Sequence, residues 1–133
     1  MEPQINADER RSDLNQITSR IIGCVYRVSN RLGCGYLEKI YENALVIELR
    51  RAGLCLEQQH SISVFYDDAL IGQCLVDILV DRRVIVELKA VKALDEVHAA
   101  QCLNYLKAAG LKICLLVNFG RPRVQVKRIV SDY

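Results

Sequence analysis

The sequence contains no tryptophan, and aromatic residues of all kinds make up only 6% of it. Wide aromatic platforms for stacking single-stranded bases are therefore not expected. No apolar run approaches the roughly 18 residues of a membrane-spanning helix, and the polar first residues lack the apolar segment of a signal peptide. These absences predict a cytoplasmic protein that does not contact membranes.

Neither sign of charge dominates, because 18 Lys and Arg residues stand against 16 Asp and Glu residues, for a net charge of +2. This excludes a histone-like protein that binds by bulk charge, but it leaves nucleic-acid binding through local contacts open. The chain has 133 residues, of which 51% are hydrophobic and 26% charged, enough for one folded core. We expect a single domain over residues 1–133, with a flexible tail at residues 1–12.

The six cysteines are scattered along the chain, and no two of them form a C-x-x-C pair. Most lie within apolar segments. This distribution predicts reduced thiols in the core rather than a zinc site, an iron–sulfur cluster or disulfides.

Hydrophobic periodicity predicts eight elements in the order α-α-β-β-β-α-β-β. Helical spacing of apolar residues indicates helices over residues 12–32, 37–52 and 95–109. In the second helix Leu37, Ile40 and Tyr41 are expected to face inward. Alternating or continuous apolar runs indicate strands over residues 61–66, 74–80, 84–89, 111–118 and 124–130. One sheet with helices packed on it, an α/β fold, follows.

Three charged residues on neighbouring predicted strands suggest a chemical site. Asp77 lies inside the apolar strand 74–80, where an unpaired carboxylate is costly and needs a partner or a metal ion. In the next strand a period of two places Glu87 and Lys89 on one face. The connection 81–83 has the odd length that lets Asp77 and Glu87 face the same side of an antiparallel pair.

Two carboxylates on adjacent strands form an oxygen-rich site for a hard cation such as Mg²⁺, and the Leu88 carbonyl could add a further oxygen. A lysine beside that cation could orient or deprotonate an attacking water, or stabilise charge on a phosphate. This combination predicts hydrolysis of a phosphodiester. The alternative is an ordinary solvated strand face, on which a Glu-x-Lys pattern is common, and the apolar setting of Asp77 argues against it.

Two further groups are weaker candidates. His98, Gln101 and Tyr105 share a stripe of the third helix and could contact a nucleotide or an ordered water, although a half-solvated helix face has the same pattern. Glu38 and Tyr41 lie one turn apart near the start of the second helix, where the helix dipole alone accounts for an acidic residue.

In combination these segments resemble the GxxExxY family, a branch of the PD-(D/E)XK nuclease superfamily. The motifs that carry the resemblance are Gly35-Tyr36-Leu37-Glu38-Lys39-Ile40-Tyr41, Asp77 with Glu87-Leu88-Lys89, Gln101 with Tyr105 as a Q-x-x-x-Y element, and Asn118-Phe119-Gly120. The resemblance covers about residues 17–130, and the order of the motifs makes it specific.

The resemblance implies a restriction-endonuclease-like mixed sheet flanked by helices, in agreement with the predicted order of elements. It also implies one or two Mg²⁺ or Mn²⁺ ions held by Asp77, Glu87, the Leu88 carbonyl and Glu38. Lys89 would be the catalytic lysine. The expected substrate-contacting residues are His98, Gln101, Tyr105 and Tyr41.

Two functions are therefore expected from the sequence. The first is a metal-dependent nuclease, and the alternative is a catalytically silent module that binds nucleic acid or a protein partner. We expect nucleic acid as the partner, DNA ahead of RNA, and a homodimer or larger complex because so small a core leaves little room for substrate recognition. Candidate phosphate contacts are Arg82, Arg83, Arg121, Arg123, Lys127 and Arg128.

Overall fold

The computed structural model describes residues 7–131 of the chain. Its elements are α1 (Ala7–Leu32), α2 (Glu38–Arg51), β1 (Leu56–Tyr66), β2 (Ala69–Val80), β3 (Val84–Lys89), α3 (Glu96–Ala109), β4 (Ile113–Asn118) and β5 (Gln125–Val130). This is the predicted order. The predicted tail differs, because α1 already begins at Ala7, and the rest of that tail, residues 1–6, lies outside the described part of the chain.

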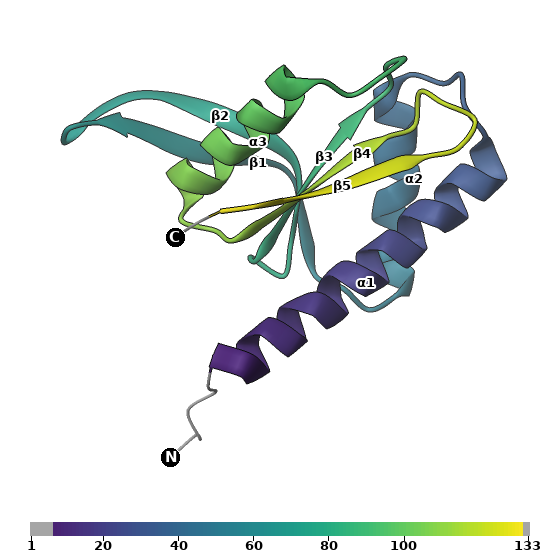
Figure 1. Ribbon diagram of the computed structural model, residues 1–133, viewed down its shortest axis with the longest axis horizontal. Helices are drawn as coiled ribbons and strands as arrows, with labels where there is room; N and C mark the ends of the chain where they lie inside the picture. The colour runs from purple at the N-terminus through teal and green to yellow at the C-terminus, as the bar shows by residue number, and fades with distance from the viewer. Residues whose placement is uncertain (1–6, 132–133) are drawn as a thin grey trace.

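The strands form one mixed sheet in the order β1-β2-β3-β4-β5. Neighbouring strands are antiparallel except β3 and β4, which run parallel and are joined through α3. Helices α1 and α2 cover one face of the sheet and α3 covers the other (Figure 1). Because β3 and β4 are parallel, their carboxyl ends lie side by side at the same end of the sheet.

Side-chain alternation divides β3 between two apolar cores. Val84, Val86 and Leu88 pack with α1 and α2, whereas Ile85 packs in the core beneath α3. Glu87 therefore shares the α3 face with Ile85, as the period of two predicted.

The second helix differs from its prediction at its first turn. Leu37 and Ile40, expected to face inward, are exposed, whereas Tyr41, Leu45 and Leu49 are fully buried. The reason is that Leu37 is the N-cap and the buried stripe of α2 starts only at Tyr41. No helix in the described residues is long and apolar enough to cross a membrane.

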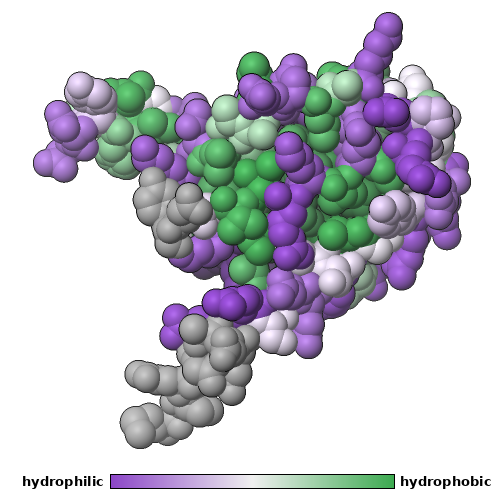
Figure 2. Space-filling model, viewed as in Figure 1, coloured by the Kyte–Doolittle hydropathy of each residue, from purple (hydrophilic) through white to green (hydrophobic). Residues whose placement is uncertain are grey.

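Strands β1 and β2 extend beyond the body of the sheet as a two-stranded arm (Figure 1). Only the end of β2, residues 78–80, pairs with β3, so the outer part of the hairpin has no strand on its other side. We call residues 61–75 the hairpin arm. Its exposed apolar residues are Phe65, Tyr66, Leu70, Ile71 and Leu75, and Figure 2 shows hydrophobic residues interspersed with hydrophilic ones on it.

All six cysteines are free thiols, of which three are buried, two are exposed and one, Cys74, is partly buried. Cys24, Cys102 and Cys114 are buried, as predicted. Cys34 and Cys55 are exposed, because they lie in the connections that follow α1 and α2 rather than in an element.

Candidate active site

Asp77 and Glu87 lie opposite each other at the point where β2 separates from β3. The ladder between these strands ends at the pair formed by Ile78 and Val86. Beyond it, the Asp77 N–H donates to Glu87 Oε1 at 2.8 Å, and the Leu88 N–H donates to Asp77 Oδ2 at 2.8 Å. These two bonds hold each carboxylate through one oxygen, and the second oxygen of Asp77 has one further contact, with Gln59 Nε2 at 3.4 Å.

The register that produces this arrangement is the one predicted from the odd length of the connection. Val80 pairs with Val84, which leaves residues 81–83 as the turn. Asp81 and Arg82 adopt φ angles of 51° and 56°, so the turn reverses the chain through left-handed backbone positions.

Desolvation and mutual repulsion dominate the electrostatics of the two carboxylates. Burial, followed by the charge of Asp77, raises the pKa of Glu87 to about 7. Burial also raises the pKa of Asp77, against the effect of the Leu88 N–H. Such a pair favours either protons or a bound cation over two uncompensated charges.

The third helix supplies two polar side chains to this face of the sheet. Lys89 Nζ donates to Gln101 Oε1 at 3.2 Å. One turn later, burial and the charge of Glu87 raise the pKa of Tyr105 to about 12, so its hydroxyl keeps its proton at neutral pH. The structure thus brings Gln101 and Tyr105 to the cluster.

His98, from the same predicted stripe, is used in a helix cap. Its Nδ1 accepts from the Asp95 N–H at 3.1 Å, and Asp95 Oδ1 accepts in return from the His98 N–H at 3.2 Å. This reciprocal cap satisfies exposed donors at the start of α3. A structural role therefore accounts for His98 without a substrate.

Tyr41 lies in the core rather than at the surface. Its hydroxyl donates to the Gly33 carbonyl at 2.7 Å, and its ring stacks on Phe119 with centroids 4.5 Å apart. Because Tyr41 has no exposed surface, the substrate contact expected from the sequence is not available to it. Tyr41 instead fixes the connection between α1 and α2.

Glu38 lies near the pair but does not complete a three-carboxylate group. It is exposed, and its charge contributes to the raised pKa of Glu87. Within residues 7–131, however, no three His, Cys, Asp or Glu side chains are arranged to hold a metal ion. The part that the family resemblance implied for Glu38 at the metal site stays a prediction.

Sequence reasoning missed a link between α2 and Asp77. Gln59 Nε2 donates to Glu42 Oε1 at 2.9 Å and lies 3.4 Å from Asp77 Oδ1. Lys39 and Gln58 also donate to Glu42, which is buried. The spacing of Glu38 and Glu42 on one helix face was the available signal.

Gln59 also marks a break in the strand. Its φ is 54°, a left-handed value inside β1. In β2, Ile78 packs in the core of α1 and α2 but Val76 packs in the core of α3, so the normal alternation fails at Asp77 between them. The break lies next to Ile78, where the ladder between β2 and β3 ends.

Asn118 clamps the segment that follows Lys89. Its Oδ1 accepts from the Val91 N–H at 3.0 Å, and its Nδ2 donates to the Val91 carbonyl at 2.9 Å. The Phe119 N–H also donates to the Lys89 carbonyl at 2.9 Å. At Gly120 a Cβ would lie only 2.3 Å from the Val91 carbonyl oxygen, so this clamp requires glycine.

Comparison with known proteins agrees with this fold. A family model described as the PD-(D/E)XK nuclease superfamily matches residues 15–129. Comparison with curated proteins gives no match. Among solved structures, the crystal structure of SSO0001 is similar, with a TM-score of 0.57 and 16% identity over 100% of this chain and 70% of that chain. At that identity the likeness concerns the fold alone. The family model, together with the mixed five-stranded sheet and its flanking helices, confirms the predicted restriction-endonuclease-like architecture.

Proposed function

The chain belongs to the PD-(D/E)XK nuclease superfamily, and we propose that it hydrolyses phosphodiester bonds in nucleic acid at Asp77, Glu87 and Lys89 with a divalent metal ion. One observation carries the proposal. Two carboxylates from neighbouring strands are held by main-chain N–H groups of the opposite strand, Glu87 by the N–H of Asp77 and Asp77 by the N–H of Leu88. The lysine follows two residues later on the same face.

The donor chemistry of this pair fits a hard divalent cation. Asp77, Glu87 and the Leu88 carbonyl would hold Mg²⁺ or Mn²⁺, with Glu38 contributing directly or through a water. Such an ion would offset the repulsion between these two buried negative charges. A bound cation would polarise a phosphodiester oxygen and lower the pKa of a water molecule.

The neighbouring side chains have separate roles in this proposal. The ammonium group of Lys89, which Gln101 holds in place, orients the attacking water or stabilises negative charge on the phosphate. Tyr105, which keeps its proton, donates to a phosphate oxygen. Gln59 positions the Asp77 carboxylate.

Within the superfamily we propose the GxxExxY branch, because the structure gives each residue of that motif a reason. Gly35 has a φ of 116°, which strongly favours glycine. Tyr41 is buried and fixes the connection before α2. Glu38 is exposed, which leaves its carboxylate available to the metal site.

The test is cleavage of labelled single- and double-stranded DNA and RNA with Mg²⁺, Mn²⁺ or EDTA. We expect cleavage only with a divalent cation, on DNA ahead of RNA, and a loss of roughly 10²- to 10⁴-fold in Lys89→Ala. Lys92→Ala, an exposed lysine of the following loop, is the matched control.

Absence of cleavage under every condition, with nucleic acid still bound, would replace this proposal by the silent binding module. Cleavage that survives in both EDTA and Lys89→Ala would show that the chemistry lies elsewhere.

A further inference from the structure

An open pocket of about 790 Å³ lies at the end of the sheet opposite to Lys89. Its walls come from the first turns of α1, the turn before β3, the start of β4 and the end of β5. Its basic lining residues are Arg10, Arg11, Arg83, Lys112 and Arg128, and no lining residue is acidic. We call this cavity the basic pocket.

Two of these arginines hold the walls together. Arg83 pairs with Asp13 of α1. Arg128 donates to Asn15 Oδ1 at 3.1 Å and to the Thr18 hydroxyl at 2.5 Å. Because Asn15 and Thr18 are neutral, these bonds orient the Arg128 guanidinium without cancelling its charge.

Two other basic side chains in the basic pocket make no contact that stabilises the fold in the part of the chain that the structure describes. The side chains of Arg11 and Lys112 have no hydrogen bond or ion pair within the described residues. Both line the cavity, one from α1 and the other from the start of β4. Positive side chains that come together from distant segments of the chain without acidic partners are typical of a site that binds an anionic ligand.

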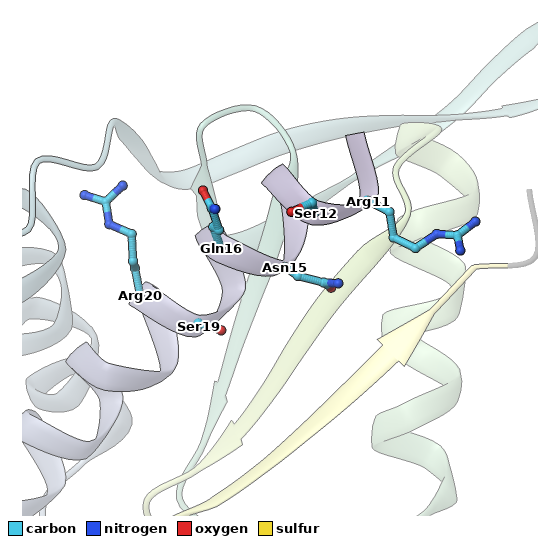
Figure 3. Close-up of a pocket in the computed structure, with 6 residues that line it drawn as sticks. All are labelled: Arg11, Ser12, Asn15, Gln16, Ser19 and Arg20. Carbon is cyan, nitrogen blue, oxygen red and sulfur yellow. The ribbon is translucent and has the colours of Figure 1, made fainter. Parts of the chain in front are cut away.

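A second cavity of about 650 Å³ adjoins the basic pocket along α1. The two share Arg11 and Asn15. The remaining lining residues are Ser12, Gln16, Ser19 and Arg20. Figure 3 shows Arg11 and Asn15 extending from one side of the helix, whereas Gln16 and Arg20 leave it in another direction. Hydroxyl, amide and guanidinium groups of this kind are common phosphate contacts.

We propose that the basic pocket and the adjoining face of α1 bind the phosphodiester backbone of a nucleic acid, as a contact separate from the catalytic cluster. Two open, adjoining cavities fit an extended polyanion better than a single phosphate. This assignment of the ligand rests on the proposed function.

The spacing along the sheet is consistent with one continuous ligand. The five steps from Val84 to Lys89 along β3 span about 17 Å at about 3.3 Å per residue. Phosphates follow one another at about 3.4 Å of helix axis along each strand of a duplex. The two contacts are thus about five base pairs apart, well within one short duplex.

The test is fluorescence anisotropy of a labelled 20-base-pair DNA with the full chain in EDTA, where no metal-dependent cleavage can intervene. The variant is Arg11→Ala with Lys112→Ala. The control is Arg50→Ala with Lys107→Ala, which removes the same charge from exposed positions outside the basic pocket. We expect the pocket variant to bind about tenfold more weakly at 0.1 M salt and to lose about 2 from the slope of log K against log salt.

Binding by the pocket variant that equals wild type, or an equal loss in the control, would overturn the proposal. Saturable binding of AMP or inorganic phosphate as tight as that of the duplex would also overturn it, in favour of a small-anion site. Anisotropy in EDTA measures binding alone, whereas the cleavage assay measures the chemistry. Binding through the basic pocket without cleavage would therefore contradict the nuclease proposal alone, and cleavage without a pocket effect would contradict this inference alone.

Discussion

At Glu87 the protonation state is linked to folding. Burial and the Asp77 carboxylate raise its pKa from 4.5 to about 7 in the folded chain, which means that folding favours the protonated acid. Its stabilising contribution is therefore fully present below about pH 4.5 and is lost as the pH rises through about 7. The difference corresponds to roughly 3 kcal/mol.

We expect urea unfolding without divalent ions to show a stability decline of that order from Glu87 between pH 5 and pH 8. In Glu87→Gln, whose side chain stays neutral, this part of the decline should disappear. Glu96→Gln, at an exposed position, should keep it. Parallel pH profiles for Glu87→Gln and wild type would show that Glu87 titrates normally.

At Gln59 the side chain and the backbone can be tested separately. Gln59→Gly and Gln59→Ala both remove the link between Glu42 and Asp77. Glycine accepts the φ of 54°, whereas alanine does not, so alanine should be less stable than glycine by about 1 kcal/mol.

If Gln59 positions Asp77, Mn²⁺ affinity measured by calorimetry should fall to a similar extent in both variants. Urea unfolding should separate them. If the Mn²⁺ affinity falls more in the less stable variant, or stays at the wild-type value in both, Gln59 does not position Asp77 and has only a structural role in β1.

At the scale of elements, the amino-acid pattern predicted the features that depend on periodicity. The stripe of α1, the order of the strands and the shared face of Asp77 and Glu87 follow from spacings of 3.6 and 2 and from an odd turn length. The left-handed Gln59 was not predictable, because tertiary contacts impose it. The helical spacing did predict that Tyr41 faces inward, but not that its ring stacks on Phe119 from the far end of the chain.

The length of the hairpin arm was missed for a related reason. Gly72 and Gln73 interrupt the apolar pattern of β2, and its first five residues, 69–73, are all exposed and keep no alternation of buried and exposed side chains. Pairing with β1 across the hairpin maintains the strand there instead.

The clamp between β4 and the segment after β3 gives a prediction at this scale. In Gly120→Ala the new Cβ would meet backbone atoms of Val91 at 2.3 and 2.4 Å, which side-chain rotation cannot relieve. We expect a loss of roughly 2–4 kcal/mol in the free energy of unfolding. Gly72→Ala, where nothing lies within 4 Å, should be nearly neutral in the same urea titration. Equal stabilities of the two variants would contradict the close approach at Gly120.

At the scale of the whole molecule, the hairpin arm exposes apolar side chains to solvent, which is unfavourable for an isolated chain. It combines exposed Phe65, Tyr66 and Ile71 with β1, an edge strand that has an unpaired side. Exposed apolar residues on an open edge favour pairing with another chain. We therefore expect the proposed homodimer to form through this arm.

Sedimentation equilibrium checks this expectation. Wild type should associate with rising concentration, and Phe65→Ser with Ile71→Ser should remain monomeric at the same concentrations. Leu103→Ser, an exposed apolar residue of α3, is the control that should still associate. A wild type that stays monomeric throughout would contradict a homodimer.

The Asn118 clamp has a consequence for the order in which the site forms while the chain is being synthesised. Asp77 and Glu87 are ten residues apart, so their hydrogen bond can form as soon as the β2–β3 hairpin has emerged. The bonds between Val91 and Asn118 join residues 27 positions apart and need β4. Because synthesis runs from the N-terminus, a nascent chain contains both carboxylates before the residue that fixes the strand end carrying Lys89 has been made. A ribosome stalled before β4 would thus carry the carboxylates without the clamp that completes their surroundings.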